Sequence, residues 1–119
     1  MDITIEHIHN KGNYNEEYVS LKVEANCDAG QYILADTTYT ADGSVSAKLR
    51  HVFWLPDKKV VAGDYIWVHT KSGMPSENSN RANTKTHHVY WGLNTSVWND
   101  DGDCAALFHY DKWMTKSVK

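Results

Sequence analysis

Apolar and polar side chains alternate along residues 18–25, and this is the clearest pattern in the chain. The apolar positions are Val19, Leu21, Val23 and Ala25, and the polar positions between them are Ser20, Lys22 and Glu24. A period of two places successive side chains on opposite faces of a β-strand. We therefore expect a core strand here, with its apolar side facing inward.

Similar alternation predicts further strands on both sides of this segment. Residues 2–8 place Ile3 and Ile5 on one side, and residues 45–55 form a long alternating run that Pro56 ends. Shorter strands are expected over residues 31–34, 65–70, 88–91 and 104–109. Turn sequences rich in Asn, Asp and Gly separate these segments.

The arrangement of these elements predicts an all-β fold. No stretch of the sequence shows a helical period of 3.6 residues. About seven to nine short strands with turns between them indicate an antiparallel β-sandwich or barrel. With 119 residues, the chain has the length of one domain, so we expect a single domain over residues 1–119.

One segment departs from the alternating pattern. Residues 71–86 read K-S-G-M-P-S-E-N-S-N-R-A-N-T-K-T and are nearly all polar. Long loops without structure of their own are uncommon unless they are mobile or functional. The sequence therefore indicates a flexible or binding loop here.

Composition and charge narrow the classes of partner. The net charge is −3 and the isoelectric point is near 6.1, which disfavours a nucleic-acid binder with a basic surface. No apolar run approaches the length that crosses a bilayer, and the first residues lack the features of an export signal. We expect a soluble, cytoplasmic protein that does not bind a membrane.

The two cysteines, Cys27 and Cys104, do not have metal or redox spacing. Buried, reduced thiols are the favoured interpretation. Because both lie near predicted strands, a disulfide across the core remains the alternative if the compartment is oxidising.

Five ordered motifs resemble those of the lamin tail domain. They are E-Y-V-S-L-K at 17–22, F-W-L-P at 53–56, V-A-G-D-Y-I at 61–66, W-G-L-N at 91–94 and W-N-D-D-G-D-C-A-A-L at 98–107. Their order and spacing match that family along most of the chain. Residues 26–44 depart from it, because they have G-Q-Y-I-L-A-D where many members have D-L-S-G-W-x-L.

The resemblance implies an immunoglobulin-like β-sandwich and a stand-alone, non-enzymatic interaction module. Members of the lamin tail family occur in nuclear lamins and, in bacteria, beside nucleases and other enzymes. A member without an attached enzyme is expected to bind or assemble with a protein partner.

Candidate chemical sites are weak in this sequence. The acidic turn 99–103 contains several carboxylates but lacks the spacing of a calcium loop, so a structural turn is favoured. The seven histidines show no pair with evident metal-ligand geometry, and His87 and His88 are neighbours whose side chains diverge in a strand. No nucleophile or phosphate-binding motif is present. We expect a protein that is not an enzyme and that uses no cofactor or metal.

Outward-facing aromatic residues are the best functional candidates. If Phe53 and Ile66 face the core, their neighbours in sequence must face solvent, and exposed aromatic clusters often mark interfaces. The candidate binding residues are Trp54, Tyr65, Trp67, His69 and Trp91. The alternative is that residues 71–86 fold over these rings and bury them.

The leading hypothesis is therefore a module that binds a protein partner, or a second copy of itself, through this aromatic face and the 71–86 loop. Carbohydrate recognition is the first alternative, because aromatic platforms stack on sugars and the chain holds nine asparagines. Nucleic-acid binding is less favoured and would need a local patch of basic residues, namely Lys48, Arg50, Lys58 and Lys59. A role as a toxin-immunity protein also stays open.

Overall fold

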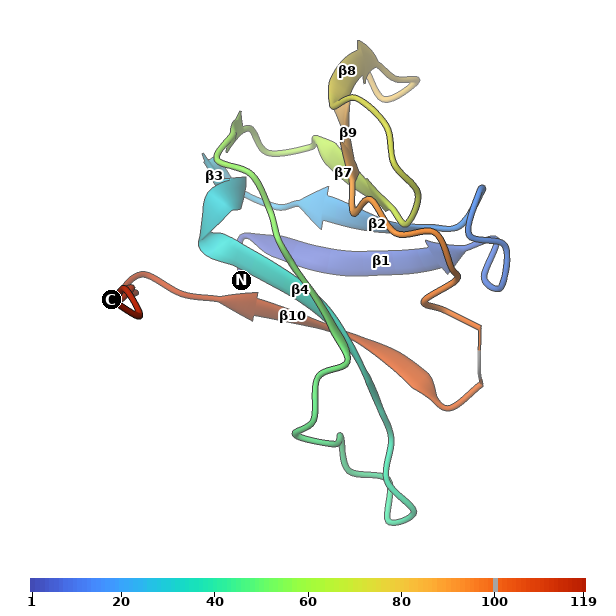
Figure 1. The fold of residues 1–119 in the computed structure, drawn as a ribbon. Coiled ribbons are helices and arrows are strands. Elements are labelled where there is room, and N and C mark those ends of the chain that lie inside the picture. The colour runs from blue at the N-terminus through green and yellow to red at the C-terminus, as the bar shows by residue number, and fades with distance from the viewer. Residues whose placement is uncertain (100) are drawn as a thin grey trace.

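The protein is a sandwich of β-sheets, as the sequence predicts (Figure 1). The computed structural model describes residues 1–99 and 101–119. Its main elements are a five-stranded sheet, a three-stranded sheet and a two-stranded ribbon. No helix in the described residues is long and apolar enough to cross a membrane.

The strands are short and follow one another along the chain with turns between them. Their bounds are β1 (Ile3–His9), β2 (Tyr18–Val23), β3 (Cys27–Asp28), β4 (Tyr32–Thr38), β5 (His51–Trp54), β6 (Lys59–Val60), β7 (Tyr65–His69), β8 (Ser76–Ser79), β9 (Lys85–Tyr90) and β10 (Asp103–His109). A single 3-10 turn, η1 (Ala29–Gln31), precedes β4.

The five-stranded sheet has the order β1-β2-β7-β9-β8, and the three-stranded sheet has the order β10-β4-β5. Strands β3 and β6 form the ribbon. The named strand pairs are antiparallel, as expected, except β7 and β9, which run parallel. A parallel pair requires a crossover connection, and residues 70–84 supply it while contributing β8 to the sheet edge.

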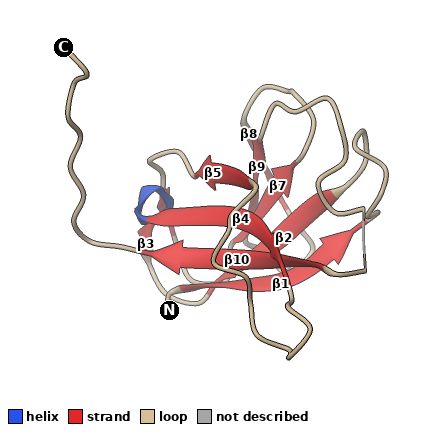
Figure 2. Ribbon diagram, turned by 60° about the horizontal axis from the view of Figure 1, so that its bottom comes forward, coloured by secondary structure: helices blue, strands red, loops and turns tan. Residues whose placement is uncertain are grey.

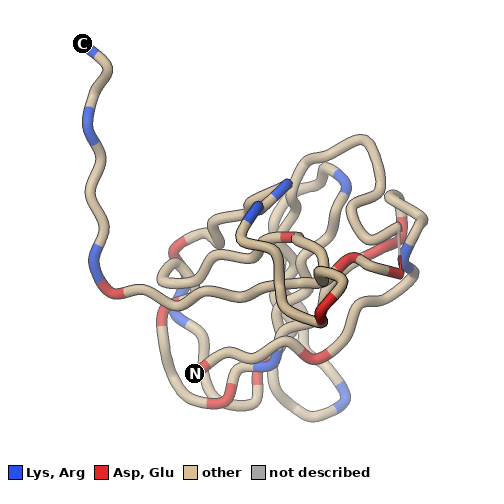
Figure 3. The backbone as a smooth tube through the Cα atoms, turned by 90° about the horizontal axis from the view of Figure 1, so that it is seen from below, with Lys and Arg blue, Asp and Glu red and all other residues tan. Residues whose placement is uncertain are grey.

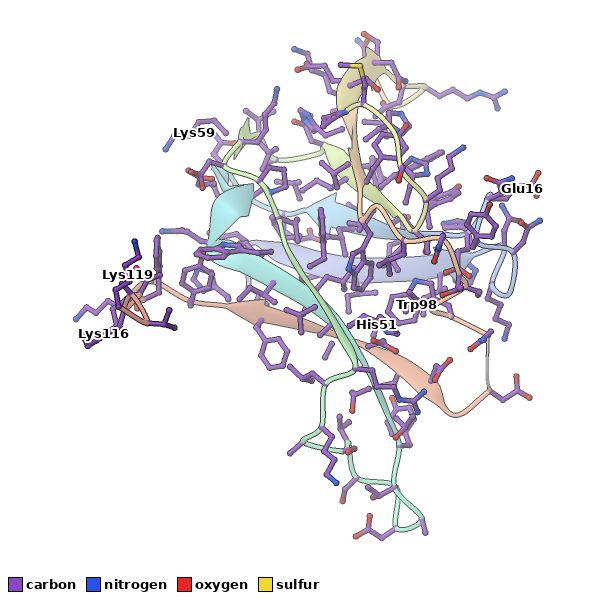
Figure 4. The ribbon with its side chains drawn as sticks, in the orientation of Figure 1. Glu16, His51, Lys59, Trp98, Lys116 and Lys119 are labelled. Carbon is purple, nitrogen blue, oxygen red and sulfur yellow. The ribbon has the colours of Figure 1, made fainter. Side chains whose placement is uncertain are left out.

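The core lies between the two larger sheets and follows the predicted alternation. Val19, Leu21 and Val23 on β2 are fully buried, and Ile66 and Val68 on β7 are almost so. The three-stranded sheet contributes apolar side chains from the opposite layer. The other members of the buried cluster are Ile3, Ala29, Tyr32, Leu34, Leu55, Val60, Val89, Val97 and Trp98, and Figure 4 labels Trp98 within the fold.

Strand β1 is less completely buried than its alternation predicts. Ile3 is fully buried, but Ile5, which was expected on the same inward side, is 36% exposed. Ile5 still pairs with Leu21 on the inward side, so its exposure follows from the position of β1 at the edge of the sheet. A β-bulge follows, where the pairing of β1 with β2 shifts between Ile5 and His7. A bulge adds one residue to one strand and so changes which side later side chains face.

The long strand expected over residues 45–55 is wrong in its first half. Only β5 forms, and Val45 and Leu49 are largely exposed. The hydroxyl of Thr37 donates to the carbonyl groups of Ser46 and Lys48, at 2.8 and 3.1 Å. These bonds hold residues 46–48 across the outer side of β4, where they cannot pair as a strand.

The polar segment 71–86 is a hairpin in large part, and the expectation of a loop is wrong there. Strand β8 pairs with β9, and all four residues of β8 are exposed. In the turn, the side-chain oxygen of Asn80 accepts hydrogen bonds from the backbone N–H groups of Ala82 and Thr84, at 3.0 and 3.1 Å. The side chain of Asn80 therefore fixes the shape of this turn.

Residues 110–119 follow β10 and run away from the sandwich (Figure 2). All the side chains from Asp111 to Lys119 are exposed. Basic residues recur along this segment after Asp111 (Figure 3).

Candidate functional site

Six aromatic and imidazole side chains cover the outer side of the five-stranded sheet, and we call them the ring face. They come from four adjacent strands, β1, β2, β7 and β9. Their positions follow from strand register, because residues on one face of neighbouring strands lie side by side. The ring face consists of His9, Tyr18, Trp67, His69, His88 and Tyr90.

The first half of the ring face is a continuous stack. The rings of His9 and Tyr18 lie 4.3 Å apart at an interplanar angle of 13°. The rings of Tyr18 and Trp67 lie 4.2 Å apart at 17°. Tyr18 is therefore sandwiched on both of its faces, and Trp67 has one face covered.

In the second half, the imidazole of His69 stacks on Tyr90 and meets the imidazole of His88 edge to edge. The His69 ring lies 4.7 Å from that of Tyr90 at 15°, and 5.2 Å from that of His88 at 23°. His88 also meets Trp67 edge to face at 5.3 Å, which joins the two halves. The ring face is thus one packed surface across four strands.

A hydrogen-bond chain fixes the two imidazoles on β7 and β9. The Asn78 amide nitrogen donates to the Ser79 carbonyl, so its oxygen faces His88 Nε2, 2.7 Å away. His88 Nε2 then carries the proton, and His88 Nδ1 accepts from His69 Nε2 at 2.9 Å. The hairpin strand β8 is thereby tied to the ring face through Asn78.

Burial keeps the two imidazoles of this hydrogen-bond chain, His69 and His88, neutral. Burial, with smaller contributions from the charges of His88 and Lys71, lowers the pKa of His69 from 6.5 to about 4. Burial and the neighbouring His87 also lower the pKa of His88. The ring face therefore carries no imidazolium charge from these two residues at neutral pH.

At the β1 edge, a serine is committed to internal hydrogen bonds. The Ser20 hydroxyl donates to Glu6 Oε1 at 2.9 Å, and it lies 3.0 Å from His9 Nε2, from which it accepts. Burial and the charge of His7 lower the pKa of His9, although Glu6 partly offsets them. Ser20 is 1% exposed, so its oxygen is out of reach of a substrate.

A groove of about 700 Å³ lies between the ring face and the β8–β9 hairpin, and we call it the hairpin groove. Concave sites for small ligands have volumes of this order. Glu6 and Arg81 are its charged residues. Its lining consists of Glu6, His9, Tyr65, Trp67, Asn78, Asn80, Arg81, Ala82, Thr86 and His88.

The structure divides the five predicted binding residues into three places. Tyr65, Trp67 and His69 point outward from β7, as expected, and lie on or beside the ring face. Trp54 is 46% exposed but belongs to the three-stranded sheet. Trp91 packs against Phe53 and Trp98 at the edge of the core, apart from the ring face, and its role in binding stays a prediction.

Sequence reasoning missed four residues of the ring face, namely His9, Tyr18, His88 and Tyr90. Tyr18 was within reach, because it has the same outward alternation as Ser20. His88 and Tyr90 could not be predicted, because only the parallel pairing of β7 and β9 places them beside Trp67 and His69.

Metal-ligating side chains do not gather in the described residues. No group of three or more His, Cys, Asp or Glu side chains there is placed to hold a metal ion. Asp100, part of the acidic turn considered for calcium, lies outside the described residues. Cys27 and Cys104 are free thiols in this structure.

No protein-family model, curated protein or solved structure matches the chain. The lamin tail resemblance rests on the five sequence motifs, and it stays a prediction.

Proposed function

We propose that this protein is a non-catalytic interaction module of the lamin tail type that binds a segment of a partner protein on the ring face and in the hairpin groove. The observation that carries the proposal is the ring face itself. It is a packed surface of partly exposed rings spanning four strands, with a concave groove at its side. Protein interfaces are enriched in aromatic residues and arginine, and both are present here.

The orientation of the rings favours a protein over a sugar. A saccharide stacks on an exposed ring face, but Tyr18 is covered on both faces by His9 and Trp67. His69 is covered on one face by Tyr90. Tyr18 therefore presents its ring edge to the outside. Edges carry the positive end of the ring quadrupole and suit carbonyl oxygens and the side chains of another protein.

The amides of the groove point to the same conclusion. Asn78 is engaged with His88 and Ser79, and Asn80 is engaged with its own turn. These amides are the groups that a carbohydrate site would use, and here they serve the hairpin. Glu6 and Arg81 remain to orient a partner by charges of opposite sign.

Carbohydrate binding is the second candidate because of Tyr65. This ring lines the groove and makes no ring contact with another aromatic side chain in the described residues. A sugar would stack on Tyr65 alone, beside Arg81.

Blocking the groove with a bulky side chain tests the proposal. Ala82 is exposed and lines the groove, so Ala82→Trp fills it and removes none of the rings of the ring face. Ala41→Trp, in an exposed turn far along the chain, is the matched control. We expect the wild type and Ala41→Trp to capture the same protein from an extract of the source cells, and Ala82→Trp to lose it.

Two further measurements separate the alternatives. Light scattering over a concentration series detects a second copy as the partner, and Ala82→Trp should then abolish self-association. A glycan array, repeated with Tyr65→Ala, detects a saccharide. Equal capture by Ala82→Trp and Ala41→Trp, or capture of nothing, would contradict protein binding at this groove.

A further inference from the structure

A second cavity lies where β5 and β10 end, at the root of the C-terminal segment, and the proposed function does not use it. Its volume is about 510 Å³. Three aromatic rings and two carboxylates line it together with small and apolar groups. The lining residues are Gly30, Gln31, Trp54, Leu55, Pro56, Asp57, Tyr110, Asp111 and Trp113.

Two of the rings are anchored to the same backbone carbonyl. The indole N–H of Trp54 donates to the Gly30 oxygen at 2.9 Å, and the Tyr110 hydroxyl donates to it at 2.5 Å. The backbone N–H of Tyr110 also donates to the Gln31 carbonyl at 3.1 Å. These bonds hold the rings of Trp54 and Tyr110 in place before any ligand binds.

The rings form a corner. The Trp54 ring lies 4.9 Å from that of Trp113 at an interplanar angle of 88°, and 5.8 Å from that of Tyr110 at 74°. Nearly perpendicular rings cannot cover each other face to face. The electron-rich faces of this corner are therefore available to a ligand from more than one direction.

The carboxylates of Asp57 and Asp111 complete the lining. Neither makes an ion pair within residues 1–99 and 101–119. The lysines next to Asp57 are engaged elsewhere, since Lys58 pairs with Glu77 at 2.8 Å and Lys59 with Asp28 at 4.0 Å. Both negative charges therefore remain to act on whatever enters the cavity.

Asp57 packs directly against Gly30. A side chain at Gly30 would place its Cβ 2.0 Å from Asp57 Oδ1, so this carboxylate lies directly against the glycine backbone. The same glycine carbonyl holds Trp54 and Tyr110. The aromatic and the acidic parts of the cavity therefore meet at Gly30.

Aromatic ring faces combined with carboxylates attract organic cations, because both present negative potential to the ligand. We propose that this cavity binds a cationic side chain of a partner polypeptide, and arginine in preference to lysine. A guanidinium group is planar, stacks on indole rings and pairs with carboxylates through several N–H groups. Its charge complements Asp57 and Asp111.

The surface next to the cavity indicates what flanks that arginine. Trp54, Val52 and Phe108 lie on the outer side of the three-stranded sheet and are 46%, 52% and 44% exposed. Apolar side chains next to the arginine in the partner polypeptide would cover these three exposed residues. The chain's own Lys116 and Lys119 lie away from the body of the fold on the C-terminal segment (Figure 4).

This site is independent of the ring face. Trp54 belongs to the three-stranded sheet and Trp67 to the five-stranded sheet, and their outer sides face in opposite directions. Failure of one proposal therefore leaves the other untouched.

Titration with N-acetyl-L-argininamide, followed by the indole N–H resonances of Trp54 and Trp113, tests the site. The neutral isostere N-acetyl-L-citrullinamide has nearly the same shape without the charge. We expect saturable shifts with argininamide at millimolar concentration. The affinity for citrullinamide should be lower by a factor of about ten or more. N-acetyl-L-lysinamide should bind more weakly than argininamide.

Charge-neutralising variants locate the interaction. Asp57→Asn with Asp111→Asn should abolish the response, and both positions are exposed, so the fold should persist. Glu16→Gln with Asp42→Asn removes the same net charge from exposed positions outside the cavity lining and should leave binding unchanged. Trp113→Ala should weaken binding while the Trp54 resonance still reports it.

Several outcomes would overturn the proposal. Equal affinity for argininamide and citrullinamide would show packing without charge recognition. The absence of saturable shifts would exclude the site. Loss of binding in the Glu16 and Asp42 control would attribute the effect to net charge, and tighter binding of lysinamide would reject the preference for a guanidinium group.

Discussion

The carboxylate of Glu17 accepts a hydrogen bond from the backbone N–H of Val97 at 2.8 Å, although 80 positions separate the two residues in the chain. The hydroxyl groups of Thr70 and Ser96 donate to the same carboxylate. Glu17 is 1% exposed. One buried carboxylate therefore joins the segment before β2 to the segments that follow β7 and precede β10.

Replacing Glu17 by Gln should destabilise the fold. The amide nitrogen of Gln cannot accept, so buried donors lose a charged partner, at a cost of about 3 kcal/mol in the free energy of unfolding. Urea denaturation at neutral pH measures the change. The neighbouring Glu16→Gln is the control and should cost less than about 0.5 kcal/mol, because Glu16 is exposed. Equal effects of the two substitutions would contradict a structural role for the Glu17 carboxylate.

The same carboxylate should contribute to acid sensitivity. Burial alone would raise the pKa of Glu17, but hydrogen bonds from Ser96, Thr70 and the Val97 and Trp98 amides outweigh it, so its pKa is lowered from 4.5. The stabilisation is present above pH 4.5 and is lost as the pH falls through the lower pKa of the folded state. Glu17→Gln should therefore flatten the stability profile below that pH.

His69 should also reduce the stability of the fold on acidification, and at a higher pH than Glu17 does. Its pKa is about 4 in the folded protein and 6.5 as an unperturbed group, so the unfolded chain binds more protons between these values. Stability should decline as the pH drops from 6.5 to about 4. We expect His69→Phe, which keeps the stack, to reduce this decline in urea denaturation, whereas Tyr90→Phe should leave it unchanged. A wild-type profile that is flat across this range would contradict the neutral, buried state of His69.

Local alternation was enough to predict the core strands. Val19, Leu21 and Val23 are all fully buried because a period of two directly reports which side of a strand is covered. The same argument placed Ile66 inward and Trp67 outward correctly. Periodicity reports which side a residue faces and not how well that side is covered: Ile5 pairs with Leu21 on the inward side, but β1 is an edge strand and Ile5 is 36% exposed.

Which strands lie side by side could not be predicted, and the candidate site depends on it. His69 and His88 share a hydrogen bond only because β7 and β9 are parallel neighbours. Trp54 and Trp67 both face outward, yet they lie on different sheets, whose outer sides point apart. The sequence pattern thus predicts that a side chain faces outward, but it does not predict which other outward side chains lie beside it.

Strand β8 was missed because its sequence carries no hydrophobic signal. It is an edge strand with all four residues exposed, so composition suggests a loop. Its position is set by pairing with β9 and by the contact between Asn78 and His88. Edge strands are often polar, since exposed apolar edges invite aggregation.

The two cysteines should titrate as free thiols. Cys27 lies on β3 and Cys104 on β10, in different sheets, and burial together with nearby aspartates raises the pKa of both. A thiol-reactive disulfide reagent should therefore detect both thiols in the protein unfolded without reductant. In the native protein Cys104, which is 8% exposed, should react slowly. Detection of fewer thiols without reductant than with it would show that the pair is oxidised.

Gly63, at the entry to β7, should resist substitution for two separable reasons. Its φ is +94°, a conformation that residues with a Cβ rarely adopt, and an added Cβ would lie 2.9 Å from Thr84 Cγ2. Gly63→Ala should cost about 2 kcal/mol in the free energy of unfolding.

Thr84→Ser removes the methyl group and keeps the hydroxyl that donates to Asn80. In the Thr84→Ser background, Gly63→Ala should therefore cost less, with about 1 kcal/mol of backbone strain remaining. An identical cost in both backgrounds would show that the methyl contact contributes nothing, and no cost in either would contradict the strained conformation at Gly63.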